Sequence, residues 1–353
     1  MSHEKESNQQ ENNTSRTELG KLGEFGLIKE MTKNIKIQHE ESILGVGDDA
    51  AIVKNDDQTL ITTDMLLEGI HFDLSYTPLT HLGYKAVAVN VSDIAAMNGI
   101  PKQITVNLGL SNRFSLEAVE ALYKGIYAAC DDYKVDLIGG DTTSSGSGLV
   151  ISVTAIGHQA QDKIVRRNSA KDKDIICVSG DLGGAFMGLN VLEREKQAYK
   201  SNPDIQPDLT KYSYVVERQL KPKARMDVVY ELKELGILPT AMIDISDGLA
   251  SELFHIASQS ELGVQIYEDK VPIATKTYET AVEFNIDPNT AALNGGEDYE
   301  LLFTISQEDY EKIKNHMELT TIGYMHAKSK GMNFVTKNNQ VVELKAQGWQ
   351  HLK

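Results

Sequence analysis

Residues 242–256 read MIDISDGLASELFHI, and this stretch indicates the fold most clearly. Its apolar, β-branched start predicts a buried strand, and the Ser-Asp-Gly that follows predicts a sharp turn. The apolar residues after the turn keep helical spacing: Leu249, Leu253 and Ile256. A strand that turns directly into a helix is typical of an α/β domain. Strand patterns at 175–178 and 301–305 extend this alternation, so we expect the second half of the chain to form such a domain.

The first half of the chain predicts an α+β domain. Residues 114–130 keep helical spacing, and Ser115 is a suitable N-cap for that helix. Strand patterns cover three further segments: 59–63, 135–138 and 149–156. The first of these runs into Asp64, and the second runs into a Gly-Gly-Asp sequence that ends in Asp141. We therefore expect both carboxylates at the ends of strands.

We expect three parts along the chain. Residues 1–17 are polar and contain no aromatic side chain, which predicts a disordered tail. An N-terminal α+β domain is expected over residues 18–157. A polar stretch over 158–174 follows it, and we place the domain boundary at the start of this stretch. The C-terminal α/β domain then covers residues 158–353.

The composition excludes several classes of partner. The chain has 51 acidic and 35 basic side chains and a formal net charge of −16, which disfavours binding to nucleic acid or to anionic membranes. No stretch approaches the roughly 18 apolar residues of a membrane span, and the N-terminus lacks the apolar core of a signal peptide. Two cysteines, Cys130 and Cys177, cannot form a disulfide framework. We therefore expect a cytoplasmic protein.

Acidic residues recur beside glycines and at predicted strand ends. Six such clusters contain Asp48, Asp49, Asp64, Asp93, Asp141, Asp244, Asp247, Glu297 and Asp298. An unpaired charge in an apolar or glycine-rich segment costs several kcal/mol, and these segments contain no lysine or arginine that could compensate it. A hard divalent cation with oxygen ligands, above all Mg²⁺, is the simplest compensation. Each carboxylate taken singly could instead serve as a turn residue or a helix cap.

Other phosphate and hydrolase motifs are absent from the sequence. It contains no G-x-x-x-x-G-K-[ST], H-E-x-x-H or G-x-S-x-G pattern. GVGDDA at 45–50 fits a degenerate dinucleotide-binding pattern, but it continues into a β-branched segment and a polar turn and not into the helix that such a motif requires. The type of site that remains possible is a glycine-rich one in which carboxylates bind metal ions and the metal ions bind phosphates. Such a site favours phosphoryl transfer.

Eight motifs in register carry a resemblance to a known family. They are GVGDDAA, TTD, GIHF, YKAVAVNVSDIAAMNG, LIGGDTT, LKPKAR, IDISDG and GGEDYELLFT. In this order they resemble the thiamine-monophosphate kinase family, whose superfamily includes aminoimidazole ribonucleotide synthetase and selenophosphate synthetase. The resemblance covers about Glu24 to Trp349. It implies an N-terminal domain that dimerises through its sheet, with ATP and thiamine monophosphate bound between the two domains. It also implies that residues 86–91, which alternate like a strand, lie on a helix.

The resemblance assigns site residues by position. The implied magnesium ligands are Asp49, Asp64, Asp93, Asp141, Asp244 and Asp247, with Thr62 and Thr63 assisting. The implied ATP contacts are Tyr123, Gly140, Asp141, Arg167 and Ser246. The implied substrate contacts are His71, Glu297 and Trp349, the last of which could also cover an edge of the core. The catalytic carboxylates among them are Asp49, Asp141 and Asp247.

The implied reaction needs no general base, because a phosphate monoester with a second pKa of about 6 is mostly a dianion at neutral pH. We therefore expect direct in-line transfer of the γ-phosphoryl group without a phosphoenzyme, with several Mg²⁺ ions screening the repulsion between the two anions. Three alternatives remain open: a related ATP-dependent synthetase, a non-catalytic magnesium and nucleotide binding module, and a metal-dependent phosphohydrolase. A selenophosphate synthetase would need a reactive cysteine near its N-terminus, and none precedes Cys130.

Overall fold

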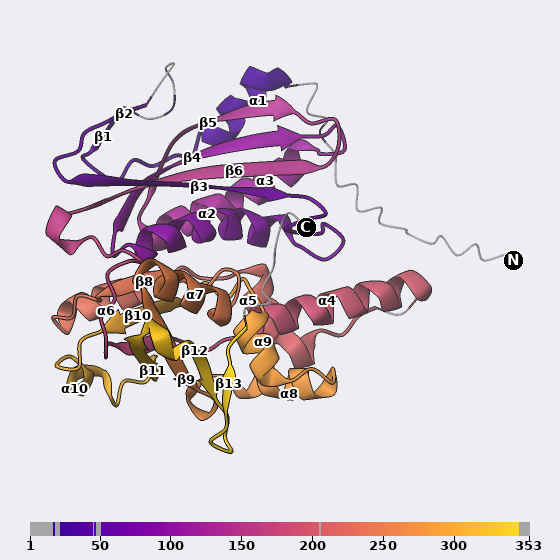
Figure 1. Ribbon diagram of the computed structural model, residues 1–353. Helices are drawn as coiled ribbons and strands as arrows, with labels where there is room; N and C mark the ends of the chain where they lie inside the picture. Colours follow the sequence, from indigo (N-terminus) through magenta and orange to yellow (C-terminus); the bar gives the residue numbers. More distant parts are fainter. Residues whose placement is uncertain (1–16, 18–21, 45, 47–50, 205, 346–353) are drawn as a thin grey trace, which may run out of the picture.

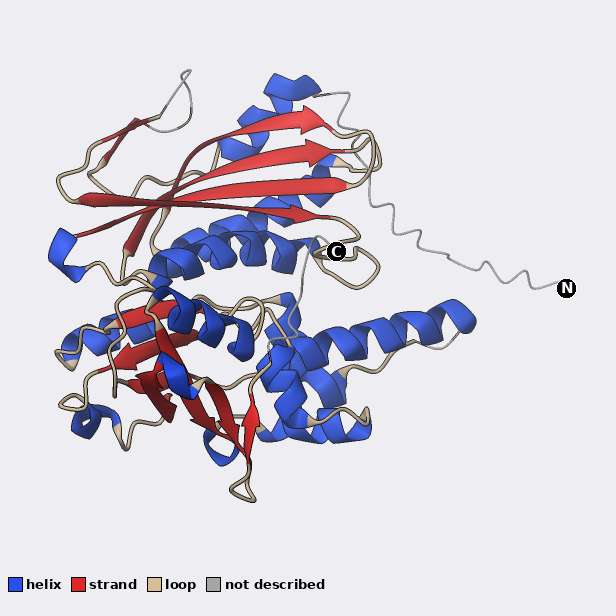
Figure 2. Cartoon of the chain, in the orientation of Figure 1, coloured by secondary structure: helices blue, strands red, loops and turns tan. Residues whose placement is uncertain are grey.

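The computed structural model describes residues 17, 22–44, 46, 51–204 and 206–345. Within this part of the chain, two large sheets lie in two domains that meet through helices (Figure 1, Figure 2). The N-terminal sheet has the strand order β3 (Gln58–Leu67), β6 (Leu149–Gln159), β4 (Ile100–Leu110) and β5 (Asp136–Ser144). Its pairs are antiparallel except for β4 and β5, which are parallel. A separate two-stranded sheet joins β1 (Ser42–Leu44) and β2 (Ile52–Val53).

Two long helices cover one face of the N-terminal sheet (Figure 1). They are α2 (Leu79–Ala96) and α3 (Leu116–Tyr133), and a shorter helix, α1 (Gly23–Thr32), packs on α3. Ser115 caps α3 as predicted, because its side chain accepts a hydrogen bond from the backbone N–H of Ala118 at 3.4 Å. A Cβ at Gly83 would collide with the backbone oxygen of Leu122, and one at Gly125 would collide with that of Thr80. Glycine at both positions therefore lets the two helix backbones touch.

Residues 86–91 lie in α2, as the family resemblance implied and the alternating pattern did not. The helix is buried along nearly its whole length, since residues 82–92 are all buried. It lies between the N-terminal sheet and the C-terminal domain, where it contacts both (Figure 1). A helix covered on every side needs no single apolar stripe, so its sequence lacks the usual helical periodicity.

The predicted positions of Asp64 and Asp141 at strand ends were wrong. β3 continues three residues past Asp64 to Leu67, because β6 offers backbone partners up to Val150. β5 likewise continues past Asp141 to Ser144, which pairs with Leu110 of β4. Both carboxylates therefore project from strand interiors, where alternation determines the face on which each side chain lies.

The C-terminal domain is built on a mixed seven-stranded sheet. In order, its strands are β13 (Val341–Glu343), β12 (Met332–Val335), β9 (Leu262–Tyr267), β11 (Leu319–Ala327), β7 (Ile175–Ser179), β10 (Leu301–Ile305) and β8 (Ala241–Asp244). Only β12 and β9 are parallel neighbours. Its helices are α4 (Gly184–Ser201), α5 (Ser213–Leu220), α6 (Met226–Glu234), α7 (Leu249–Gln259), α8 (Thr275–Glu283), α9 (Pro288–Asn294) and α10 (Tyr310–Ile313).

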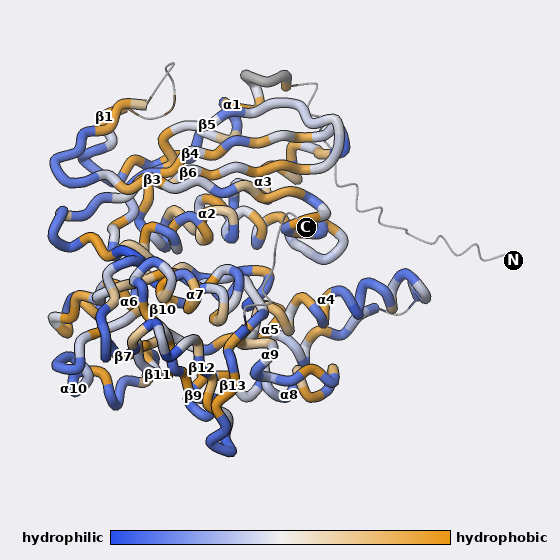
Figure 3. Tube along the Cα trace, in the orientation of Figure 1, coloured by the Kyte–Doolittle hydropathy of each residue, from blue (hydrophilic) through white to orange (hydrophobic). Residues whose placement is uncertain are grey.

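The strand, turn and helix predicted from residues 242–256 are present as β8, the Ser-Asp-Gly turn and α7. Helix α7 packs on one face of the sheet through Leu249, Leu253 and Ile256. Helix α4 projects from this domain, and its outer half is hydrophilic (Figure 3). No helix in the described ranges is long and apolar enough to cross a membrane.

Candidate active site

A cavity of about 530 Å³ lies where the two domains meet. Its walls come from β3 and the loop after it, from α2, α4 and α5, and from the turns on either side of residues 246 and 297. Seven of the site residues predicted from the sequence line it: Asp64, His71, Asp93, Asp244, Ser246, Asp247 and Glu297. The structure therefore gathers side chains that lie up to 233 positions apart in the chain.

Three carboxylates on adjacent elements form the acidic side of the cavity. Asp64 comes from β3, Asp93 from α2 and Asp244 from the end of β8. Hydroxyl groups join these elements: Thr62 donates to the carboxylate of Asp93, and Ser92 donates to that of Asp244 at 2.7 Å. Because even-numbered residues of β3 face α2, Thr62 and Asp64 lie on the same side of the strand.

The three carboxylates lie close enough to one another for their charges to interact. Burial raises the pKa of Asp64 to about 6 and that of Asp244 to about 7, and in both cases the charge of Asp93 raises the pKa further. Burial also raises the pKa of Asp93 itself. None of the salt bridges in the described part of the chain involves these three side chains. A cation in this part of the cavity would therefore be stabilised.

The donor set fits a hard divalent cation, although the described side chains do not already form a metal centre. Carboxylate and hydroxyl oxygens are the ligands that Mg²⁺ prefers. Among the residues that the structure describes, no three acidic, histidine or cysteine side chains are grouped closely enough to hold a metal. Asp48 and Asp49, which the sequence places with this set, lie outside the described residues.

The turn that carries Asp247 is fixed by a residue that sequence reasoning missed. A carboxylate oxygen of Glu252 accepts backbone hydrogen bonds from Ser246 at 3.1 Å and from Asp247 at 2.8 Å. Gly248 has a φ of 113°, and a Cβ there would press against the backbone of residues 293 and 294. The position of Glu252 in the first turn of a helix was the available signal, since acidic side chains there satisfy free backbone N–H groups.

Glu297 enters the cavity from a turn with an unusual backbone. Glu297 and Tyr299 have φ values of 65° and 52°, in the left-handed region that side-chain-bearing residues rarely adopt. The backbone N–H of Glu297 donates to Ser246 at 2.7 Å, and that of Tyr299 donates to Ile245 at 2.9 Å. The turn is therefore tied to the segment that carries Asp247.

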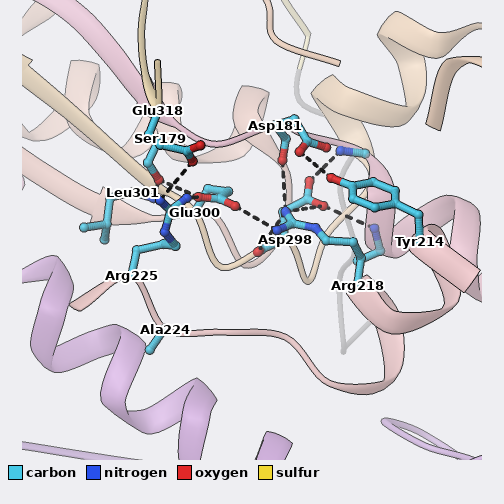
Figure 4. A network of polar contacts seen from close by, with 12 residues as sticks. Ser179, Asp181, Tyr214, Arg218, Ala224, Arg225, Asp298, Glu300, Leu301 and Glu318 are labelled. Carbon is cyan, nitrogen blue, oxygen red and sulfur yellow. Dashed lines mark hydrogen bonds and ion pairs between the residues drawn. The ribbon is translucent and has the colours of Figure 1, made fainter. Parts of the chain in front are cut away.

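The expectation that metal compensates every acidic cluster was wrong for the GGEDYE motif, because cations from distant segments pair with it. Glu297 forms an ion pair with Lys85 of α2 at 2.9 Å. Glu300 pairs with Arg218 of α5 at 2.8 Å and also with Arg225 (Figure 4). Sequence reasoning missed these partners, because nothing in their spacing links them to the motif.

Asp298 has the role of a helix cap and not of a metal ligand. Its carboxylate accepts backbone hydrogen bonds from Gly183 at 2.7 Å and from Ala185 at 3.3 Å, at the start of α4. This helix terminus follows the glycine-rich sequence SGDLGG and would otherwise suit an anion. The carboxylate of Asp298 already occupies that position, so the glycine-rich turn is not a free phosphate site.

Four predicted site residues lie away from the cavity. Thr63 is on the opposite face of β3 from Asp64 and donates to the backbone of Val153 at 3.1 Å. Gly140 is aligned with Asp64 across β6 and β4, and three strand spacings separate them by about 14 Å. Asp141 follows Gly140 on β5 and is exposed. Tyr123 is buried in α3.

The last predicted residues are Arg167 and Trp349. Arg167 is exposed in the segment between the two sheets, and its charge lowers the pKa of Asp93 and Asp244 against the effect of burial. It is therefore close enough to the acidic side of the cavity to act on it electrostatically. Trp349 lies outside the described residues.

Two family models match the chain in tandem. The N-terminal domain of AIR synthase related proteins matches residues 47–159, and the C-terminal domain of these proteins matches residues 172–329. The thiamine-monophosphate kinase of Bacillus subtilis is 36% identical over 342 residues, which are 94% of this chain and 100% of that protein. The chain belongs to the thiamine-monophosphate kinase family. The predicted family and two-domain fold are thereby confirmed.

Solved thiamine-monophosphate kinases share this fold. AaThiL complexed with AMPPCP and TMP matches with a TM-score of 0.74 and 32% identity, over 95% of this chain and 98% of that chain. The thiamine-monophosphate kinase of Stenotrophomonas maltophilia K279a matches with a TM-score of 0.77 and 32% identity, over 92% of this chain and 98% of that chain. The hydrogenase maturation protein HypE in complex with ATP is only 20% identical, at a TM-score of 0.70, so its likeness extends to the fold alone.

Proposed function

We propose that the protein transfers the γ-phosphoryl group of ATP to thiamine monophosphate and forms thiamine diphosphate. One observation carries the proposal: a relative with 32% identity over nearly the whole chain was solved with AMPPCP and TMP. The acid-lined cavity between the domains supports it, because it contains two of the three proposed substrate contacts, His71 and Glu297. We propose Trp349 as the third contact, and Tyr123, Gly140, Asp141, Arg167 and Ser246 as the ATP contacts.

The attacking group in this proposal is the substrate phosphate, which needs no base to remove a proton. His71 would serve as a donor and not as a base. Its Nδ1 accepts a hydrogen bond from the backbone N–H of Leu67 at 3.1 Å, so the neutral ring carries its proton on Nε2. Direct in-line transfer follows, since no side chain has to carry the phosphoryl group between the two substrates.

We infer that several Mg²⁺ ions assist the transfer. The residues that we propose to hold them in the cavity are Asp64, Asp93, Asp244 and Asp247, with Thr62 beside Asp93, and the mutual effect of Asp64, Asp93 and Asp244 supports this assignment most directly. Asp49, Thr63 and Asp141 complete the proposed set, although Thr63 and Asp141 lie away from this cavity. When bound, such ions neutralise the phosphates of both substrates and so reduce their mutual repulsion. The protein's own part is to hold the carboxylates in place through Thr62 and Ser92.

A release assay for ADP tests the proposal. The purified protein is incubated with ATP and Mg²⁺ and with thiamine monophosphate, with thiamine, with a panel of other small acceptors or with no acceptor. We expect ADP and thiamine diphosphate in equal amounts with thiamine monophosphate, and a loss of at least about a hundredfold after Mg²⁺ is removed with EDTA. Phosphate release without an acceptor would identify a phosphohydrolase, and ATP binding without turnover would identify a binding module. Turnover with another acceptor would identify a related synthetase.

We also propose that the protein is a homodimer that pairs through the N-terminal sheet. Helices α2 and α3 cover one face of this sheet, and the opposite face of β3 exposes Ile61 by 69% and Met65 by 53%. Large apolar side chains on an uncovered sheet face favour a partner surface. Ile61→Asp is expected to shift the molar mass in light scattering from two chains to one. Ile70→Asp, at an exposed apolar residue outside the sheet, is the control; a dimer unaffected by Ile61→Asp would contradict the proposed interface.

Two further expectations remain proposals. The boundary between the domains is proposed at residue 158, and it is supported by the end of β6 at Gln159 and the start of β7 at Ile175. A reducing, cytoplasmic location is supported by Cys130 and Cys177, which are both free and buried.

A further inference from the structure

Glu297 is held in the cavity by one side chain from each domain, and we propose that Lys85 is a positioning residue that sets the orientation of this carboxylate for the phosphoryl acceptor. The inference deepens the proposed function and rests on it. Lys85 belongs to α2 of the N-terminal domain, and its side chain is only 3% exposed although it lines the cavity. A lysine is almost never buried to this extent unless it is paired.

Each oxygen of the Glu297 carboxylate has its own donor. The ammonium of Lys85 lies 2.9 Å from Oε1, and the side-chain amide of Gln219 donates to Oε2 at 2.6 Å. Lys85 also donates to the backbone oxygen of Gln219 at 3.3 Å, so the two donors are joined to each other. This arrangement fixes both the position and the rotation of the carboxylate, because two donors from different directions leave it one orientation.

The backbone beneath Glu297 is anchored separately. Arg218, which precedes Gln219 in α5, donates to the backbone oxygen of Asp298 at 3.4 Å and to that of Asp181 at 2.9 Å (Figure 4). It also pairs with Glu300 at 2.8 Å. Helix α5 therefore supports the turn through Arg218 and the Glu297 side chain through Gln219. A left-handed residue persists only where the surroundings determine it, and strained backbone of this kind is concentrated at functional sites.

The orientation of Glu297 depends on Lys85 more than on the turn. The backbone hydrogen bonds of the turn run to Ser246 and Ile245 of the C-terminal domain, whereas Lys85 pairs with Glu297 from the N-terminal domain. A buried ion pair contributes little net stability, because desolvation of the two charges offsets their attraction. What the pair does provide is a defined direction for a carboxylate at the wall of the cavity. Loss of that direction weakens binding of the acceptor without altering how ATP is held.

The test is a double-mutant cycle in steady-state kinetics. Lys85→Met, Glu297→Gln and the double variant are assayed for ADP release with thiamine monophosphate and with ATP varied in turn. We expect Lys85→Met to raise KM for thiamine monophosphate about tenfold, with kcat and KM for ATP changed less than about twofold. In the Glu297→Gln background the same substitution is expected to have an effect below about twofold, because Lys85 acts through Glu297. Lys102→Met, which removes a partly buried lysine paired with Glu41 at 3.3 Å, is the matched control.

The possible outcomes separate this inference from the proposed function. If the unaltered protein forms no ADP with thiamine monophosphate, both fail. If it does, the function stands, and three results would overturn the inference. They are an unchanged KM for thiamine monophosphate in Lys85→Met, an equal effect of this substitution with and without Glu297→Gln, and a fall in kcat alone. Gln219→Met provides an independent variant, because it removes the donor to Oε2; if Lys85→Met does not fold, the same pattern in Gln219→Met supports a positioned Glu297 and its absence overturns it.

Discussion

Asp247→Asn is expected to lower kcat by about a hundredfold to a thousandfold while the free energy of unfolding changes by less than about 1 kcal/mol. Asp247 lines the cavity on a turn that Glu252 holds from behind, so an amide of the same shape leaves the local fold intact. The substitution removes a charge that the proposed reaction requires. The measurement is ADP release at saturating Mg²⁺ and thiamine monophosphate, together with chemical denaturation of both proteins.

The matched control for this prediction is Asp56→Asn. Asp56 is 86% exposed and lies in the turn before β3, outside the cavity. Asp56→Asn removes one negative charge from the chain, as Asp247→Asn does. We expect its kcat to stay within about twofold of that of the unaltered protein. Normal turnover of Asp247→Asn at saturating Mg²⁺ would contradict the assigned role. A parallel loss of folding and activity would show that Asp247 is structural.

Arg218→Met is expected to lower the free energy of unfolding by about 3–5 kcal/mol. Removal of this guanidinium takes one of two cationic partners from Glu300, which keeps Arg225 (Figure 4). It also takes the cation at 3.7 Å from Asp298, which keeps its backbone donors at the start of α4. The side chains of both carboxylates are no more than 1% exposed. The two buried carboxylates would then have to share the guanidinium of Arg225, and this excess of buried negative charge costs more than the loss of an exposed ion pair. The midpoint of urea denaturation measures the effect, with the slope checked for two-state behaviour.

Arg113→Met is the control for the buried network. Arg113 pairs with Glu68 at 2.6 Å, but its side chain is 56% exposed, and Glu68 keeps a hydrogen bond from the backbone of Leu149. Exposed pairs of this kind contribute about 0–1 kcal/mol. A loss in Arg218→Met that is no larger than the loss in Arg113→Met would contradict the view that buried charges at the base of the GGEDYE motif depend on Arg218.

The sequence was most informative where one face of an element is buried and the other is exposed. Helix α3 shows such a stripe, and its serine cap was predicted correctly, although the helix covers Leu116–Tyr133 and not the predicted residues 114–130. The periodicity of the sequence did not predict helix α2, because a helix covered by both domains has apolar residues on all of its faces. Strand ends were wrong at Asp64 and Asp141, since the length of a strand depends on its neighbour's backbone and not on its own composition.

The candidate site could be predicted only in part. Carboxylates in motifs were identified because acid beside glycine is unusual, and seven predicted residues share the cavity. Lys85, Arg218 and Gln219 were not identified, because their partners lie at least 37 positions away and no local pattern marks the pairing. Thr63 was included through its neighbours, although alternation along β3 places it on the other face.

The burial of α2 has a consequence for how ligands reach the cavity. Ser92 of this helix donates to Asp244, and Lys85 of the same helix pairs with Glu297. A hinge motion that separated the two domains would therefore break the contacts that align the acidic groups. Hinged opening of the domains is therefore an unsuitable entry route. The loop over residues 69–77 lines the same cavity and is joined to α4 by an ion pair between Asp73 and Lys196 at 2.7 Å, so we expect ligand exchange to involve local motion of this loop.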